Sequence, residues 1–451
     1  MSELMRMRWF RLDVLFWGVP LALWLFTLYF TYKYATNVPY SDAWLYPDYV
    51  VASWPATPHD LWAYLWAQHN EHRVVWDSLF QLLLVRYTAW NQYLAAFPAV
   101  LFLGAGNLCF LWHVSRRYPE LPQLQRLLLL GTLSFWLFNF RQHELLTENM
   151  VACLGLLHLT FVLYGNGFRQ FAEYGRGVII LGVLLVVGAF CVVHGLALCA
   201  FTILFVVTAL VVRHTVRKSH IVLAGFALLL PIVYFIGWQP LPNRPSVLYG
   251  LHQPSEAALF LFALIGHAFA ATPLYAVRIG MGILLLAVAG LAVAVSADGG
   301  TALWRLLVQY PLLFITGITM LGTMVGRVGF GIQQAGASRY VPMGALFAAT
   351  TLLLVFDTLR RFHPSLRTVL LASLFCLTLP VWYVNYREAV VAGWTRRTVL
   401  NAYRDCVLAH QDSPELCDDR GALLPVQHKK TLDRLVKMLR DHRMSFFAHT
   451  P

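Results

Sequence analysis

The apolar stretch VLFWGVPLALWLFTLYFTY at residues 14–32 contains no charged residue. It is long enough to cross ~30 Å of hydrocarbon as a helix, and it lacks the small-residue cleavage site of a secretory signal. Similar apolar blocks recur along the chain. Because backbone groups in lipid must be hydrogen-bonded within their own segment, we expect these blocks to be helices. The sequence predicts an all-α polytopic membrane protein.

The composition agrees with this prediction. Of the 451 residues, 59% are hydrophobic and 12% are charged, and mean hydropathy is +0.60. Soluble domains carry about 25% charged residues, so a soluble protein is excluded. The net charge of +12 lies mostly in short loops, as the positive-inside rule predicts, and does not indicate a nucleic-acid partner. Anionic lipid or a phosphate-bearing substrate is compatible with it.

The basic loops predict the topology. Arg6, Arg8 and Arg11 precede the first span, which places the N-terminus in the cytoplasm. The later loops fit about eleven spans if residues 257–271 form a re-entrant or interfacial helix. The expected spans lie near residues 14–33, 92–113, 127–140, 150–164, 177–193, 196–212, 221–238, 279–296, 304–323, 340–357 and 368–385.

Two regions are expected outside the cytoplasmic membrane. Residues 34–91 form a first outer loop with aromatic residues at helical spacing, which predicts interfacial helices over 42–53 and 60–68. Residues 386–451 form a small helical tail after a transmembrane domain of residues 1–385, with a helix over 431–443. Cys406 and Cys417 lie in this polar tail and favour a disulfide, although two unrelated thiols are the alternative.

The first outer loop carries an acid beside aromatic residues, in the sequence PYSDAW at residues 39–44. The Asp42 carboxylate could take a proton from an acceptor hydroxyl or bind a metal ion. The alternative is a helix cap, because Ser and Asp are preferred at helix N-termini. The local sequence leaves both roles open.

A run of polar residues, QHNEHR at positions 68–73, follows in the same loop between two tryptophans. Such a run is costly at a bilayer interface unless it lines a wet cavity. His69, Glu71 and His72 could form a metal site or an acid–base pair. A hydrogen-bond network that orients the loop explains the run nearly as well.

Two further outer turns carry titratable groups. Glu144 and Glu148 would share one face of a helix, where like charges repel unless they meet a cation or a substrate. A solvated helix end is the alternative, slightly favoured for Glu148. His194 occupies a tight His-Gly turn between two spans and is more often a plain loop residue.

Arginines flank a glycine-rich outer loop near the end of the transmembrane region. Arg327 ends one span, and Arg339 with Tyr340 begins the next. Two guanidinium groups on such a loop can hold a phosphate or pyrophosphate. The alternative is that the arginines anchor span ends by reaching toward the interface.

These features together resemble the GT-C class of membrane glycosyltransferases, in particular uncharacterised bacterial proteins associated with surface polysaccharide synthesis. The resemblance implies a polyprenyl-phosphate-linked sugar donor, a glycan or lipid acceptor, contact with membrane lipids and a location in the bacterial inner membrane. It implies that Asp42 is the base and that Arg339 and Arg327 neutralise the leaving phosphate. The other expected site residues are Glu71 and His72 beside the base, and Tyr340, His69, Arg73, Glu144 and His194 at the substrate.

Many members of that class have two adjacent acids where this chain has only Asp42, so no cofactor is certain and a divalent cation stays possible. Three other functions remain open. An O-antigen-type polymerase or ligase would depend chiefly on outer arginines and a histidine. A transporter or flippase of lipid-linked saccharide would place charges near the bilayer midplane on broken helices, whereas the span centres here are nearly free of charge. A non-catalytic assembly subunit would tolerate replacement of every residue named.

Overall fold

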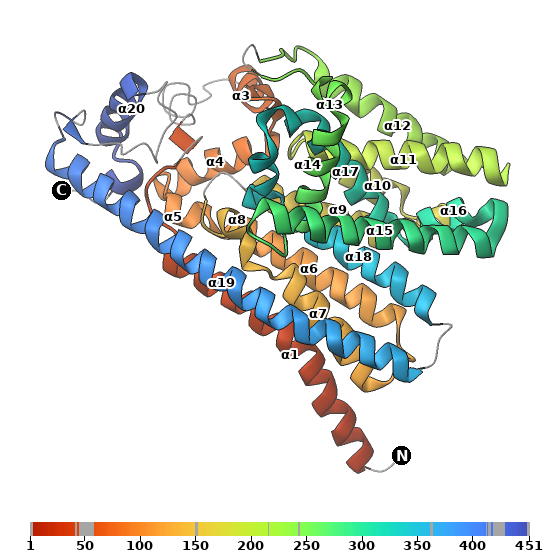
Figure 1. Ribbon diagram of the computed structural model, residues 1–451. Coiled ribbons are helices and arrows are strands. Elements are labelled where there is room, and N and C mark those ends of the chain that lie inside the picture. Colours follow the sequence, from red (N-terminus) through yellow and green to blue (C-terminus); the bar gives the residue numbers. More distant parts are fainter. Residues whose placement is uncertain are drawn as a thin grey trace.

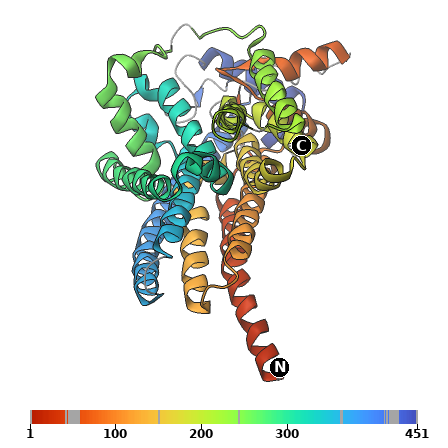
Figure 2. The ribbon, with the colours of Figure 1, turned by 90° about the vertical axis from the view of Figure 1, so that its right-hand side faces the viewer.

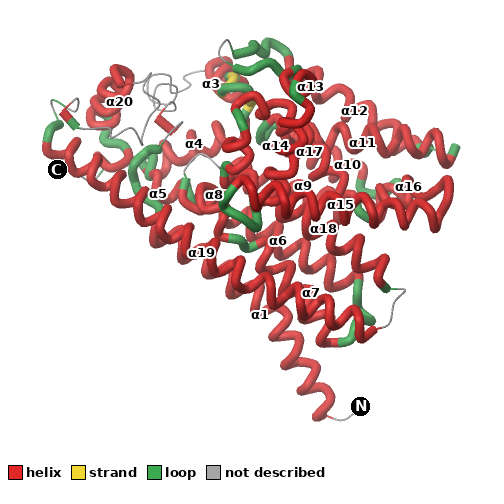
Figure 3. Tube along the Cα trace, viewed as in Figure 1, coloured by secondary structure: helices red, strands yellow, loops and turns green. Residues whose placement is uncertain are grey.

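The computed structural model is almost entirely helical (Figure 3). It describes residues 3–40, 43–44, 58–148, 152–214, 216–241, 244–360, 364–411, 413, 416–417 and 429–448. Within these ranges the strands are confined to one two-stranded antiparallel sheet. The expected helical class is confirmed.

The first half of the chain runs from the N-terminal helix through the outer loop and six longer helices (Figure 1). Its elements, with η marking 3₁₀- or π-helices, are α1 (Glu3–Tyr34), α3 (Pro58–Trp66), β1 (Gln68–His69), β2 (His72–Arg73), α4 (Val75–Thr88), α5 (Gln92–Ala95), α6 (Phe97–Arg117), α7 (Gln123–Leu137), η2 (Phe140–Gln142), α8 (His143–Thr147), α9 (Ala152–Tyr174), α10 (Val178–Ala189), η3 (Val193–Gly195), α11 (Leu196–Thr208), η4 (Ala209–Arg213) and α12 (Lys218–Phe235).

The second half contains a single long helix, α19, which contacts α1 and is followed by α20 and η11 (Figure 1). Its elements are α13 (Tyr249–His252), α14 (Pro254–Gly266), α15 (Pro273–Asp298), η5 (Gly299–Thr301), α16 (Ala302–Gln309), α17 (Pro311–Arg327), η6 (Val328–Phe330), η7 (Ile332–Gly336), η8 (Ser338–Tyr340), α18 (Val341–Leu359), α19 (Pro364–Ala409), α20 (Lys429–Asp441) and η11 (Ser445–Phe447). From the side, the N-terminal ends of α1 and α19 lie apart (Figure 2).

The length and hydropathy of the helices support a multi-pass membrane protein. In the described part of the chain, seven helical segments are long and apolar enough to cross a bilayer: Gln92–Arg117, Val193–Arg213, Lys218–Phe235, Pro273–Ala297, Pro311–Phe330, Ser338–Leu359 and Pro364–Ala409. The expected spans overlap described helices, but the one near 304–323 falls on two separate helices, α16 and α17. Seven segments, not eleven, meet both criteria, so the eleven spans are not confirmed.

The segment of ambiguous topology, 257–271, lies partly in α14, which ends at Gly266 and packs closely on α15. A Cβ at Gly280 would lie 1.8 Å from the Phe262 carbonyl oxygen, and one at Gly266 would lie 2.0 Å from that of Ala276. The two glycines therefore let the backbones touch, as small residues do between membrane helices. The 13 residues of α14 rise about 20 Å, less than the ~30 Å of hydrocarbon.

The tail and the outer loop share a hydrophobic core of their own. Trp44 and Trp90 from the loop are buried in one cluster with Tyr403 of α19 and Leu439 of α20. Since the two regions pack together, they lie on the same side of the helices. Helix α19 continues unbroken through residues 385–386, where the sequence predicted the start of the tail.

Two expectations for the tail can be compared with the structure. The helix predicted over 431–443 is present as α20. Cys406 and Cys417 form a disulfide with their Cα atoms 5.8 Å apart. The bridge ties the end of α19 to the segment that follows it.

Candidate functional site

A polar cavity of about 380 Å³ opens where the outer loop meets the ends of several helices. Segments far apart in the sequence contribute to it: the β1–β2 hairpin, α4, the start of α9, η3, the loop before α13, and the chain from the end of α17 to η8. The lining residues are Tyr40, Asn70, His72, Val74, Asp77, Glu148, Cys153, Leu154, Val192, His194, Arg244, Arg327, Phe330, Gln334, Arg339 and Tyr340.

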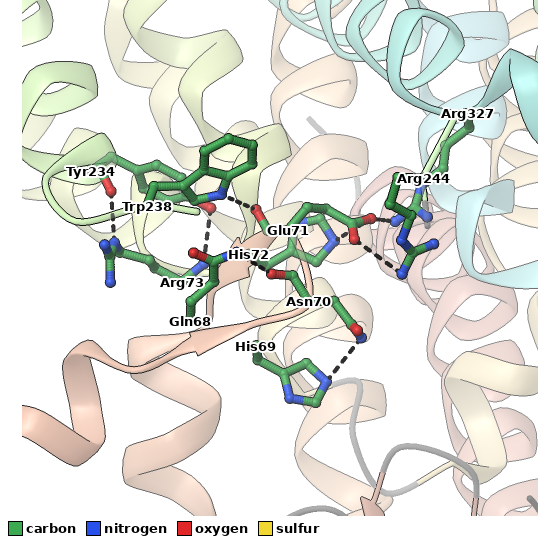
Figure 4. Close-up of polar contacts among 10 residues, drawn as sticks. All are labelled: Gln68, His69, Asn70, Glu71, His72, Arg73, Tyr234, Trp238, Arg244 and Arg327. Atoms are coloured by element: carbon green, nitrogen blue, oxygen red, sulfur yellow. Dashed lines mark hydrogen bonds and ion pairs between the residues drawn. The ribbon is translucent and has the colours of Figure 1, made fainter. Parts of the chain in front are cut away.

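The QHNEHR run forms a tight hairpin that reaches toward this cavity (Figure 4). Gln68 pairs with Arg73 and His69 with His72, and Asn70 adopts a left-handed conformation with φ 51° at the turn. Asn tolerates this conformation better than most residues. The Gln68 side chain also exchanges two hydrogen bonds with the backbone of Gln239, at 2.7 and 2.8 Å.

Arg73 anchors the hairpin to the end of α12. Its Nε donates to the Tyr234 carbonyl oxygen at 2.7 Å, and its Nη atoms donate to the carbonyls of Trp66 and Ile236. The guanidinium lies 4.6 Å from the centre of the Trp66 ring. Arg73 does not line the cavity. The sequence predicted a substrate contact for this residue, but its side chain donates to backbone carbonyls instead.

Glu71 lies at the tip of the hairpin and holds two arginines (Figure 4). Its carboxylate pairs with Arg327 and lies 3.3 Å from an Nη atom of Arg244. His72 Nε2 is 3.6 Å from the same carboxylate. Glu71 therefore positions the cationic wall of the cavity, and its own charge is compensated.

Two histidines from different elements meet in the cavity. The His72 and His194 rings are 5.9 Å apart, and the His194 ring is 6.1 Å from that of Tyr340. Burial, and then the neighbouring His194, hold the pKa of His72 well below its usual value. The imidazole is consequently neutral at pH 7, and its buried surroundings disfavour the protonated form. No described residue makes a hydrogen bond to its buried Nδ1.

Arg339 and Glu148 also line the cavity. The Arg339 guanidinium lies 5.5 Å from the Tyr340 ring. Glu148 is paired with Arg396 of α19 at 3.2 Å, and Arg396 also lies 4.8 Å above the Tyr40 ring. Through these contacts, α19 helps to position Glu148 and Tyr40 at the cavity.

The two glutamates do not share a helix face as the sequence predicted. Glu144 lies in α8, whereas Glu148 caps it in an extended conformation with ψ 152°. Glu148 lines the cavity and Glu144 does not. The backbone N–H of Glu144 donates to the Ser338 hydroxyl at 2.9 Å, which ties α8 to the segment that carries Arg339.

Some of the remaining site residues predicted from the sequence line the cavity, and others do not. His194, Arg327, Arg339 and Tyr340 all line the cavity, whereas His69 does not and lies 3.4 Å from the Asn70 side chain (Figure 4). Asp42 lies outside the described residues. Tyr40, two positions earlier, lines the cavity.

The sequence did not predict Arg244, Asp77 or Arg396 as site residues. Asp77 is 1% exposed in the first turn of α4 and lines the cavity. An acid within an amphipathic stretch was the available signal for Asp77. Nothing local marks Arg244 or Arg396, because their roles follow from which loops and helices meet.

The described residues show one group with metal-ligand spacing, and it is elsewhere. Cys406, His410 and Cys417 lie close enough together in the tail, but the two cysteines form the disulfide. The cavity itself combines three arginines, a neutral imidazole and carboxylates. Such a set can bind an anionic group and move a proton next to it.

Comparisons with family profiles, with characterised proteins and with solved structures found no match to this chain. The fold is that of a helical membrane protein, and the polar cavity is its candidate functional site.

Proposed function

We propose that this protein is a membrane glycosyltransferase that takes a sugar from a polyprenyl-phosphate-type donor and transfers it to a glycan or lipid-linked acceptor. The observation that carries the proposal is the cavity with Arg244, Arg327 and Arg339 on its walls, at the ends of apolar helices. A lipid-linked phosphate needs such a place, because its chain stays in the bilayer while its phosphate requires cations at the interface.

The three arginines would receive the donor phosphate. Glu71 keeps Arg327 and Arg244 in position at the hairpin, and Arg339 of η8 also lines the cavity. As the bond from the anomeric carbon to the phosphate oxygen breaks, negative charge grows on the leaving phosphate. Cations fixed before the reaction stabilise that charge without reorganisation.

The acceptor hydroxyl attacks the anomeric carbon and must lose its proton. Asp42 is the proposed base, and its neighbour Tyr40 lies at the cavity wall. His72 is the second candidate base, because its ring lines the cavity and its Nδ1 makes no hydrogen bond to a described residue. Either group would hold the proton once the new glycosidic bond has formed, while the lipid phosphate leaves.

For the membrane arrangement we propose about eleven crossings, with the cavity and the tail on the outer side of a bacterial inner membrane. The basic N-terminal segment and the apolar helices support this arrangement. The shared core of the outer loop and the tail is consistent with it, since both would lie outside.

A transporter of lipid-linked saccharide is the second candidate, and one observation favours it. A second polar cavity lies at the other ends of α9, α17 and α18. Between the cavities, however, α17 has no charged side chain, and the hydroxyls of Thr316, Thr319 and Thr323 donate to carbonyls of their own helix. A polar path between the cavities is not supported by these contacts, so transfer is preferred.

Mass-spectrometric profiling of surface glycans and lipid-linked sugars tests the proposal. Cells without the protein, and cells with Asp42→Asn or Arg339→Gln, should lose the same sugar and accumulate the donor. The exposed residues Asp405 and Arg387 supply controls, and Asp405→Asn and Arg387→Gln should match wild type at equal protein levels.

A normal glycan profile in Arg339→Gln cells would contradict the proposal. If only Asp42→Asn is normal, the base is not Asp42. Loss of the sugar in His72→Gln would then fit a transferase with a histidine base, whereas shortened glycan chains with an intact repeating unit would indicate a polymerase. A purified protein that moves the donor across vesicles without transferring sugar would establish transport.

A further inference from the structure

A second polar cavity lies at the far ends of α9, α17 and α18. Its volume is about 690 Å³. Helix α17 begins at this second cavity, with Pro311 and Leu312, and ends at the first, with Arg327. Its 17 residues rise about 25 Å, so the two cavities lie near opposite faces of a bilayer.

Four arginines from three helices line the second cavity. Arg116 and Arg117 end α6, Arg169 is on α9 and Arg360 follows α18 (Figure 1). Two carboxylates stand against them: Asp357 in the wall, and Glu173, which pairs with Arg169 at 3.0 Å. Two positive charges are left over, which is the charge that a phosphate monoester would balance.

One of the arginines is fixed in place by the protein. Arg117 donates to Asp357 at 2.7 Å and to the Gln309 carbonyl oxygen at 2.8 Å, and its guanidinium lies 4.6 Å from the Tyr310 ring. The Tyr310 hydroxyl donates to the same Asp357 carboxylate at 2.5 Å. The network neutralises Asp357, so this acid does not repel an incoming anion.

Two other arginines keep their charge for a ligand. Arg116 lies 4.4 Å from the Trp112 ring and has no carboxylate within ion-pair distance among the described residues. Arg360 is 4.0 Å from Asp357, which Arg117 already compensates. The N-terminus of α17 also borders the cavity, and the positive end of its helix dipole favours an anion.

We propose that this second cavity binds a phosphate group, carried either by an anionic membrane lipid or by a soluble phosphate compound. Basic residues at span ends usually face solvent and interact with many lipids weakly. Here they converge on a recess between α6, α9, α17 and α18, which gives a defined site instead of a diffuse surface. A ligand there would link four helices, two of which, α9 and α17, also line the candidate site.

The test uses the full chain purified in detergent. Binding is measured by native mass spectrometry and by the shift in melting temperature, with phosphatidylglycerol against phosphatidylcholine in one arm. Inorganic phosphate against chloride at equal ionic strength forms the other arm. The site variant Arg116→Gln/Arg360→Gln leaves the Arg117–Asp357 pair intact, so it should fold; Arg116→Gln alone is the reserve if it does not.

A control of equal charge is Arg176→Gln/Arg217→Gln, because both side chains are exposed and neither lines the cavity. We expect the site variant to bind roughly tenfold more weakly than wild type and the control to match wild type. Selective binding of phosphatidylglycerol would identify a lipid headgroup, and selective binding of inorganic phosphate a soluble ligand. Equal loss in the two double variants, or no binding by wild type in either arm, would overturn the proposal. Since no arm measures sugar transfer, the result is independent of the proposed transferase activity.

Discussion

Single side chains at the hairpin have different roles although they are adjacent in sequence. Arg73 is committed to backbone carbonyls, Glu71 to two arginines, and His72 to the cavity. The sequence predicted all three as site residues because a polar run beside tryptophans needs a wet environment. It could not tell their roles apart. Neighbouring side chains of a strand point in opposite directions, and the sequence did not predict the hairpin that determines these directions.

The ion pair between Glu71 and Arg327 can be measured directly. The side chains are 22% and 13% exposed, so water screens the pair only partly. We expect a double-mutant cycle of Glu71→Gln and Arg327→Gln to give a coupling energy of ~1–3 kcal/mol in thermal unfolding. The control pair is Arg169 and Glu173, where Arg169 is 68% exposed and coupling should be about 0.5 kcal/mol or less. Equal coupling in the two cycles would mean that Glu71 is available for a catalytic role instead.

The sequence predicted the secondary-structure elements well where apolar composition determines them. It predicted them poorly where contacts between distant segments determine them. Apolar blocks of sufficient length gave the positions of the helices. The β1–β2 hairpin was not predicted, because two-residue strands show no periodicity. It is held by residues distant in sequence, Tyr234 at the end of α12 and Gln239 in the loop after it. The cavity likewise depends on α9, α17 and α18 ending at the same place, which no local pattern encodes.

The contact between α14 and α15 supports a further prediction. Gly280→Ala would bring a methyl group against the Phe262 carbonyl and force the helices apart, at a cost of about 1–3 kcal/mol. Gly282→Ala on the same helix meets nothing within 4 Å and should be neutral or slightly stabilising. Thermal unfolding of both variants measures the difference, and equal melting temperatures would show that the helices do not touch there.

Sugar transfer should also fall in Gly280→Ala under the proposed function. Helix α14 packs on η7, whose Gln334 lines the candidate cavity, and a Cβ at Gly336 would lie 3.3 Å from the His267 ring. A shift of α14 would therefore reach the wall of the site through His267.

At the scale of the whole molecule, the tail and the outer loop form one unit on one side of the helices. Trp44 and Trp90 pack with Tyr403, and the Ser445 N–H donates to the Ala89 carbonyl oxygen at 2.8 Å. The tail and the outer loop consequently lie on the same side of the membrane, whichever side that is. A single labelling experiment on the tail also reports the side of the outer loop and of the candidate cavity.

The Cys406–Cys417 bridge supplies that experiment. If the tail faces an oxidising compartment, the disulfide forms there, and a membrane-impermeant maleimide added to intact cells should label the pair only after reduction. Cys406→Ser/Cys417→Ser should abolish this labelling, whereas Cys376→Ser should not change it. Labelling without a reductant, and only in opened cells, would place the tail, the outer loop and the cavity in the cytoplasm. That result would remove the proposed outer location while leaving the shared core of tail and loop intact, because the core depends on packing and not on the direction in which the helices are inserted.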